Sequence, residues 1–309
     1  MSASVAPEPG LLTMDPGVGI LTMAYGDPKY VGQARTLARS IRRHGSTVPL
    51  AIVTDLDPAA FRGHYDIVIE HAMAHRPFVE NKLAIGELSP FPATLLIDTD
   101  CLCVRPIEAV LEFFAGHDFA VWGANPAEFR WGHAADRVRQ VVDAPSYPLF
   151  NGGLCYFRRT PLAAEVFARA GEFRARYDSL GLDRPRGRDN DELLLSLAMA
   201  SLGLPACNEG ELTLMVAPEP PRFEMELDLL RNHCAFLRRG VRVEPEIVHF
   251  MKGRDRIPAY RREALVLALI VERGWPAAIR PLLALAAHAA SLSQRIGGRL
   301  RRLTALARG

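Results

Sequence analysis

The chain of 309 residues is 49% hydrophobic and 23% charged, which is enough apolar material to bury a large core. Its formal net charge is only +2, and residues 261–309 hold nine arginines against Glu263 and Glu272, so the preceding 260 residues carry a net charge of −5. A mildly acidic body argues against a groove that binds nucleic acid.

Neither a secretion signal nor a membrane span is predicted. Residues 1–17 lack a basic region followed by an apolar stretch, and no window offers the about 20 apolar residues that a bilayer span needs. The five cysteines are odd in number and lack C-x-x-C spacing, which is typical of a reduced, cytosolic protein. We expect a disordered lead over 1–17, one α/β domain over 18–260, a basic helical tail over 261–309 and a cytoplasmic location.

Strands and helices alternate in the first half of the chain. Apolar runs and helical periodicity predict strands over 18–24, 48–53, 65–70 and 93–97, and helices over 30–44, 79–88 and 107–114. Short links between such elements favour a mostly parallel sheet with right-handed crossovers.

The second half of the chain is less regular. The pattern predicts strands over 119–122 and 153–157, helices over 161–177 and 191–202, and short strands over 212–216 and 247–250. The loops between the last of these elements are rich in proline and charge, and we expect a substrate-specific lid there.

The tail carries an apolar stripe at helical spacing beside a strip of arginines. The stripe comprises Leu282, Leu285, Ala289, Leu292, Ile296, Leu300 and Leu303, and the strip comprises Arg295, Arg299 and Arg302. A basic amphipathic helix is typical of peripheral contact with a membrane, here its inner face. The same stripe could instead pack on the domain or mediate self-association. We expect Pro281 and Gly297–Gly298 to interrupt the helix.

Two carboxylates follow the apolar run Leu95-Leu96-Ile97. Asp98 and Asp100 point the same way from an extended chain, so the pair can share one divalent cation. Exposed acidic pairs are frequent and most are simply solvated, but the apolar residues on both sides place this pair at the rim of a buried sheet, where α/β proteins bind ligands. The pattern predicts a metal site.

The segment 95–107 resembles the D-x-D strand and following turn of the GT-A glycosyltransferases, particularly family 8, the glycogenin and lipopolysaccharide galactosyltransferase group. Four further matches occur in the same order, at 21–30, Lys82, 151–153 and 247–250. The resemblance implies a Rossmann-like mixed sheet flanked by helices. It also implies a glycosyltransferase that moves a hexose from a nucleotide-diphosphate sugar, here a uridine-linked one, to a glycan, lipid, protein or small-molecule acceptor.

The resemblance also implies roles for individual residues. Asp98, Asp100 and His249 would hold Mn²⁺ or Mg²⁺, a Lewis acid that stabilises the departing diphosphate. Asp191, Asp189 and Lys82 are the candidate catalytic groups. Contacts with the nucleotide sugar are implied for Thr22, Ala24, Tyr25, Tyr30, Lys82, Asp98, Thr99, Asn151, Gly152, Asp191 and Lys252.

Each of these residues also has a plainer interpretation. Tyr30 could cap a helix start, Lys82 could lie on a solvated helix face, Asn151 could belong to an ordinary turn, and His249 could be a core histidine. In the acidic loop either Asp189-Asn190 or Asp191-Glu192 could match the family's Asp-Gln pair. We favour Asp191 for sugar binding, although it could instead cap the next helix.

The sequence departs from the family pattern after His249. The usual lysine-proline-tryptophan cluster is missing, and Lys252 or Arg254 is left to supply the phosphate-neutralising cation. This departure weakens the implied retention of anomeric configuration.

Two other functions stay open. Haloacid-dehalogenase-type phosphatases also use D-x-D after an apolar strand, but on the first strand, whereas three predicted strands precede Asp98. A sugar-nucleotide-binding protein without catalysis is the other alternative.

Overall fold

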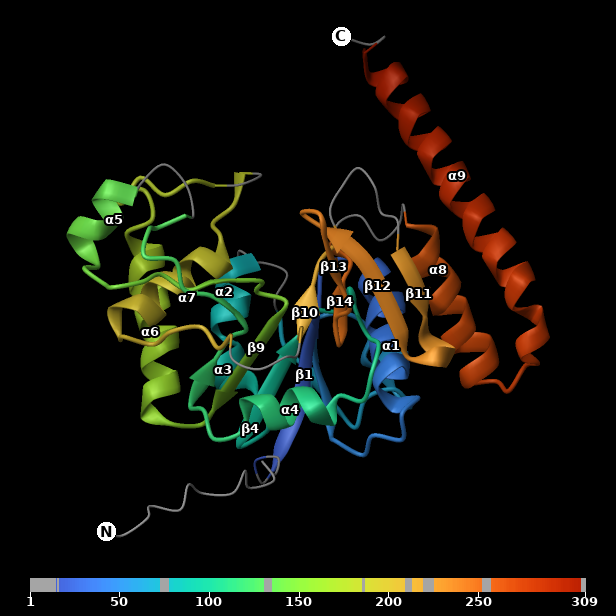
Figure 1. The fold of residues 1–309 in the computed structure, drawn as a ribbon, viewed down its shortest axis with the longest axis horizontal. Coiled ribbons are helices and arrows are strands. Elements are labelled where there is room, and N and C mark those ends of the chain that lie inside the picture. Colours follow the sequence, from blue (N-terminus) through green and yellow to red (C-terminus); the bar gives the residue numbers. More distant parts are fainter. Residues whose placement is uncertain are drawn as a thin grey trace, which may run out of the picture.

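The computed structural model describes residues 15, 17–72, 78–130, 135–184, 187–208, 213–218, 225–251 and 257–306. Figure 1 shows a central sheet with helices on both faces and a long C-terminal helix along one side. Lys252, Arg254 and most of the lead over 1–17 lie outside the described residues.

The central sheet has six strands in the order β3-β2-β1-β4-β9-β6. They are β3 (Ile67–Glu70), β2 (Leu50–Thr54), β1 (Val18–Ala24), β4 (Ala93–Ile97), β9 (Leu154–Arg158) and β6 (Phe119–Ala120). The first four are parallel, and β9 runs antiparallel to both β4 and β6. The parallel arrangement predicted for the first half is confirmed, and the second half reverses direction.

Helices cover both faces because the strands alternate their buried side chains. Ile20 packs with the helices α1 and α4, whereas its neighbour Leu21 packs with α3, α6 and α7. These helices are α1 (Lys29–Arg42), α3 (Ile85–Leu88), α4 (Glu108–Phe114), α6 (Pro161–Ala175) and α7 (Asp191–Ser201). The single helix predicted over 79–88 is instead two short ones, α2 (Phe78–Leu83) and α3. A further helix, α5, spans Ala135–Val141.

Two three-stranded sheets and one pair of strands accompany the central sheet. The strand β5 (Cys101–Cys103), absent from the sequence prediction, pairs antiparallel with β14 (Ile247–His249), and β14 pairs with β10 (Met215–Val216). A three-stranded antiparallel sheet contains β11 (Met225–Asp228), β12 (His233–Arg238) and β13 (Val241–Val243). The strands β7 (Gly123–Ala124) and β8 (Leu149–Phe150) form a separate pair.

The tail begins with α8 (Pro258–Leu265), continues through a π-helical turn (Val266–Val271) and ends in α9 (Arg280–Leu306). The predicted interruptions are wrong, because α9 continues through Gly297–Gly298 and already includes Pro281. Pro281 lies in the first turn, where a missing backbone N–H costs no hydrogen bond. The two glycines lower helix propensity by about 1 kcal/mol each but do not break the helix.

Single-turn 3₁₀ helices occur at Pro58–Phe61, Leu229–Arg231 and Ala277–Ile279. Among the described residues, none of the helices combines the length and the apolar character that a bilayer crossing requires.

Candidate functional site

Three segments that are distant in sequence meet at the carboxyl edge of β4. The backbone N–H of Asp98 donates to the carbonyl of Gly153 at 3.0 Å, and the N–H of Phe250 donates to the carbonyl of Asp100 at 3.0 Å. The pairing of β5 with β14 places His249 opposite Cys101. The turn after β4, the turn before β9 and the end of β14 therefore form one site.

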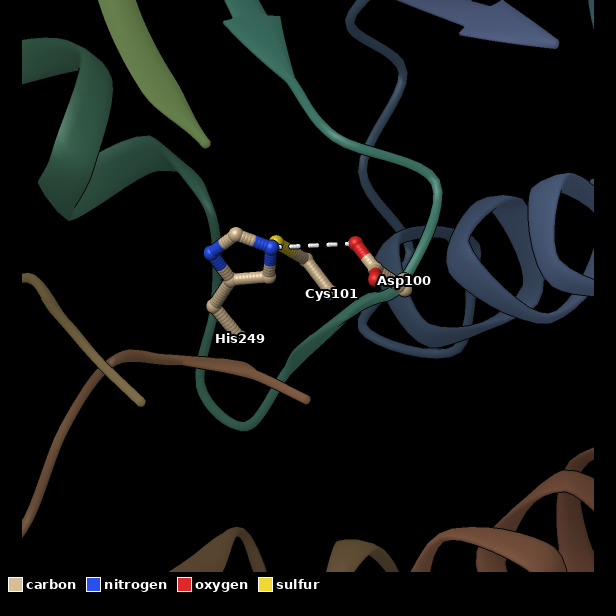
Figure 2. A group of neighbouring side chains, drawn as sticks. All are labelled: Asp100, Cys101 and His249. Atoms are coloured by element: carbon tan, nitrogen blue, oxygen red, sulfur yellow. Dashed lines mark hydrogen bonds and ion pairs between the residues drawn. The ribbon is translucent and has the colours of Figure 1, made fainter. Parts of the chain in front are cut away.

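The carboxylates of this turn converge on one imidazole nitrogen. The Nε2 atom of His249 lies 3.0 Å from Oδ1 of Asp100 and 3.8 Å from Oδ2 of Asp98 (Figure 2 shows the first contact). Cys101 also has its Sγ near this point, since the donor atoms of Asp100, Cys101 and His249 all lie within 4.8 Å of one another. The three residues expected to bind metal thus lie together, and Cys101 is an additional neighbour that was not among the predicted site residues.

A hydrogen bond at Nδ1, the other ring nitrogen, fixes the orientation of the His249 imidazole. Oδ1 of Asn151 accepts the N–H of Gly153 at 2.9 Å and lies 2.8 Å from Nδ1 of His249. Because an amide oxygen only accepts, Nδ1 carries a hydrogen, and Nε2 is the nitrogen left to face the carboxylates. A side chain at Gly153 would place a Cβ 2.7 Å from the imidazole ring, so only glycine fits there.

These residues fit a divalent cation. Burial lowers the pKa of His249, but the nearby carboxylates of Asp100 and Asp98 outweigh burial and raise the pKa. Two carboxylate oxygens and one imidazole nitrogen suit Mn²⁺, whereas the thiol of Cys101 is a soft ligand. Burial also raises the pKa of that thiol.

Lys82 borders the same site and is only 5% exposed. The interpretation that it lies on a solvated helix face is therefore wrong. Its Nζ donates to the carbonyl of Gly152 at 2.7 Å and lies 2.8 Å from Asp191 and 3.4 Å from Asp98. Burial lowers the pKa of Lys82, but the carboxylates of Asp191 and Asp98 outweigh it and raise the pKa. Lys82 is therefore a charged counter-ion that links the D-x-D turn to α7.

The structure distinguishes the acidic residues before α7. Asn190 is the N-cap, and its side chain accepts the N–H groups of Glu192 and Leu193. Asp191 is therefore not the cap, and its carboxylate turns toward Lys82. Asp189 is paired elsewhere, at 2.8 Å from Arg184 and 3.3 Å from Arg174.

Glu192 is a site residue that the sequence analysis did not select. Its Oε1 accepts the N–H of Gly152 at 2.7 Å, and a Cβ at Gly152 would lie 2.7 Å from its side chain. Burial raises the pKa of Glu192, and burial likewise raises the pKa of Asp98. Four carboxylates, those of Glu192, Asp98, Asp100 and Asp191, therefore gather around two basic side chains, Lys82 and His249, an environment that suits a further cation.

The remaining predicted residues lie around the end of β1. Thr22 and Ala24 are 1% and 0% exposed, and the Oγ1 of Thr99 donates to Gln33 of α1 at 3.3 Å. Burial raises the pKa of Tyr25, which also feels the charges of Lys82, Asp98 and Asp191, so this ring lies near the site. Tyr30 lies at the start of α1, with the Nζ of Lys29 4.9 Å from its ring centre.

Comparison with known proteins shows the fold. The chain is similar to the solved structure of the galactosyltransferase LgtC with donor and acceptor sugar analogues, at 14% sequence identity and a TM-score of 0.54, with 85% of this chain and 99% of that chain covered. An active-site mutant of LgtC matches with a TM-score of 0.55 at the same identity and coverage. No protein-family model matches the chain. No curated protein matches it either.

A likeness at 14% identity carries the fold alone. The predicted fold class is therefore confirmed: the chain has the GT-A fold, a mixed sheet flanked by helices. The activity must be inferred from the site.

Proposed function

We propose that the chain is a metal-dependent glycosyltransferase that transfers a hexose from a nucleotide-diphosphate sugar to an acceptor. The proposal depends on one observation: carboxylate oxygens of Asp100 and Asp98 lie 3.0 and 3.8 Å from Nε2 of His249. Lys82 pairs with Asp98 and Asp191 beside them. This arrangement lies at the carboxyl edge of the sheet, the ligand-binding edge of α/β folds. The likeness in fold to LgtC supports the same interpretation.

The transfer breaks the bond between the sugar's anomeric carbon and the diphosphate oxygen and forms one to an acceptor hydroxyl oxygen, whose proton is lost. Asp98, Asp100 and His249 would hold Mn²⁺ or Mg²⁺, which neutralises the negative charge of the departing diphosphate. Lys82 holds Asp98 and Asp191 in place as their counter-ion. Asp191 accepts a hydrogen bond from a sugar hydroxyl, with Asn151 and Gly152 beside it.

The donor that we propose is a uridine-linked hexose. Thr22, Ala24, Tyr25, Tyr30 and Thr99 would surround the base and ribose at the end of β1, and a tyrosine ring can stack on uracil. Lys252, or Arg254 two residues on, would supply a further cation to the diphosphate. We also propose that the anomeric configuration is retained, which NMR of the first-formed product tests directly, and that the protein acts in the cytoplasm.

Thermal shift with Mn²⁺ and uridine diphosphate tests the proposal. We expect stabilisation that requires both together, because the cation joins the carboxylates to the diphosphate. Asp100→Ala should remove this response, whereas Asp143→Ala, at an exposed aspartate in the loop before β8, should retain it. A donor panel assayed by hydrolysis then identifies the sugar. If Asp100→Ala binds the nucleotide as tightly as the wild type, then Asp100 does not belong to the metal and nucleotide site and the proposed site is wrong.

The same assays separate the alternatives. Phosphatase activity that needs no nucleotide would favour the haloacid-dehalogenase mechanism, although the carboxylate pair follows β4 and not the first strand. Tight binding of Mn²⁺ and nucleotide without turnover of any donor and acceptor would indicate a binding protein.

A further inference from the structure

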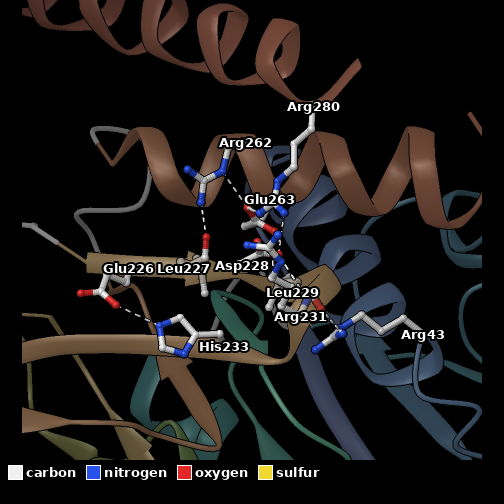
Figure 3. Close-up of polar contacts among 10 residues, drawn as sticks. All are labelled: Arg43, Glu226, Leu227, Asp228, Leu229, Arg231, His233, Arg262, Glu263 and Arg280. Atoms are coloured by element: carbon white, nitrogen blue, oxygen red, sulfur yellow. Dashed lines mark hydrogen bonds and ion pairs between the residues drawn. The ribbon is translucent and has the colours of Figure 1, made fainter. Parts of the chain in front are cut away.

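The helix α9 is fixed to the body through its first residue. Figure 3 shows Arg280 between α8 and β11, where it lies 2.6 Å from Asp228 and 3.0 Å from the buried carboxylate of Glu263. Glu263 also accepts the N–H of Leu229 at 3.0 Å and pairs with Arg262 at 2.7 Å. Burial raises the pKa of Asp228, but Arg280 outweighs it and lowers the pKa. The start of α9 is therefore held in one position.

Only one face of α9 is used for this packing. Leu283, Ala287 and Ser291 are 8%, 1% and 2% exposed, and they recur every fourth residue along the side of the helix that faces the body. The packing of α9 on α8 is thus made by small residues and a single leucine. Of the predicted apolar stripe, Leu282, Leu285, Ala289 and Leu292 are not part of this packing, and the side chains of Ile296, Leu300 and Leu303 lie outside the described part of the chain.

The four stripe residues whose side chains the structure describes lie on the other side and are open to solvent. Leu282, Leu285 and Leu292 are 64%, 69% and 44% exposed, and Ala289 between them is also exposed. Their spacing of three and four residues places them on one face. Trp275, in the turn before α9, is 48% exposed as well. Five of the ten exposed large hydrophobic residues of the described chain fall within residues 271–292, three of them on this face of α9, which marks it as a binding surface and not as scattered exposure.

The positive charge of α9 indicates which kind of partner its exposed face binds. Besides Arg280, which is paired with the body, the sequence of the helix holds four arginines and no acidic residue over its 27 residues. Association of two copies along α9 would add like charges without an acidic complement, which is destabilising. An anionic bilayer offers the complementary charge, and exposed leucines with a nearby tryptophan suit its interface.

We propose that the exposed face of α9, formed by Leu282, Leu285, Ala289 and Leu292, binds the surface of a bilayer that contains anionic phospholipid. The proposal concerns where the protein is held and does not depend on the proposed transferase activity. It places the catalytic domain beside a membrane without a transmembrane segment among the described residues.

Co-sedimentation of the full-length chain with vesicles tests the proposal. We expect binding to vesicles of phosphatidylcholine with phosphatidylglycerol, no binding to phosphatidylcholine alone, and weakening by salt. Leu285→Ser should lower the partition coefficient by about tenfold or more. Leu237→Ser is the matched control, because Leu237 of β12 is 68% exposed and lies outside α9, and this variant should bind like the wild type. Circular dichroism should show that both variants remain folded, since neither leucine is buried.

Two results would overturn the proposal. One is equal binding of the Leu285→Ser and wild-type proteins to the anionic vesicles, or no binding by either. The other is a wild-type dimer in light scattering that Leu285→Ser converts to a monomer, without vesicle binding by the wild type, because the stripe would then belong to a second copy. Neither measurement uses a nucleotide sugar, so failure here leaves the transferase proposal standing.

Discussion

Replacing Asn151 by alanine should weaken metal binding without removing any metal ligand. The Oδ1 of Asn151 is the acceptor for two donors, Nδ1 of His249 at 2.8 Å and the N–H of Gly153 at 2.9 Å. Losing a hydrogen bond to a buried donor costs about 1 to 3 kcal/mol. The loss at Gly153 lowers stability, whereas the loss at His249 frees the imidazole to rotate and to change tautomer. Loss of such an orienting partner lowers metal affinity by about 10- to 100-fold, which is about 1.4 to 2.7 kcal/mol.

Titration calorimetry with Mn²⁺ measures this loss, and ¹⁵N NMR of the imidazole reports the tautomer without metal. Asn125→Ala is the matched control, because the amide of Asn125 also makes two backbone hydrogen bonds, both to Ala206, at 2.8 and 2.7 Å. It should lose comparable stability and keep its Mn²⁺ affinity. Asn151→Asp retains an acceptor and should restore most of the affinity. Equal Mn²⁺ affinity in Asn151→Ala and wild type would refute the orienting role.

Three further predictions follow from the ion pairs. Lys82→Gln should lower the free energy of unfolding, measured by urea denaturation, by about 3 kcal/mol, because it leaves two carboxylates without their counter-ion. The control Lys29→Gln, at an exposed ion pair, should change it by less than about 0.5 kcal/mol. Asp191→Asn should reduce donor turnover about tenfold to a hundredfold, and Asp189→Asn should not; equal losses would contradict the assignment. Asp228→Asn should cost about 1 kcal/mol at neutral pH. The pKa of Asp228 in the folded protein lies below its ordinary value of 3.8, so the stability difference between wild type and Asp228→Asn should vanish as pH falls through the folded pKa. Denaturant titrations at a series of acidic pH values measure this, and a difference that stays constant would exclude the ion pair as its source.

The parts of the molecule that the sequence predicts well are those governed by local rules. The strand β1 spans Val18–Ala24 as expected, because an apolar run bounded by turn residues has few other ways to be buried. Asp98 and Asp100 also face one site as predicted, but for another reason: residues 98–100 form a turn after β4, closed by the N–H of Cys101 on the carbonyl of Asp98 at 3.1 Å, and not the extended chain that the sequence favoured. His249 was placed beside them only by the resemblance to a family, since 149 residues separate it from Asp100.

Other features depend on contacts between distant segments. A lysine in a helix is normally solvated, and the burial of Lys82 depends on the arrival of Gly152 and Asp191 from other elements. Asn190 and Asp191 are both good caps, and which one caps α7 is decided by the competing attraction of Asp191 to Lys82. The split between α2 and α3 and the pairing of β5 with β14 likewise follow from tertiary packing.

The charge balance of the site indicates how the protein tolerates so many buried carboxylates before a ligand arrives. Lys82 pairs with Asp98 and Asp191, at 3.4 and 2.8 Å, while Nε2 of His249 lies 3.0 Å from Asp100. The divalent cation of the proposed function would be held at this nitrogen, because neutral imidazole is the form that binds metal. The Nζ of Lys82 is buried and also held by the carbonyl of Gly152, so Lys82 would keep its contacts when the cation is bound.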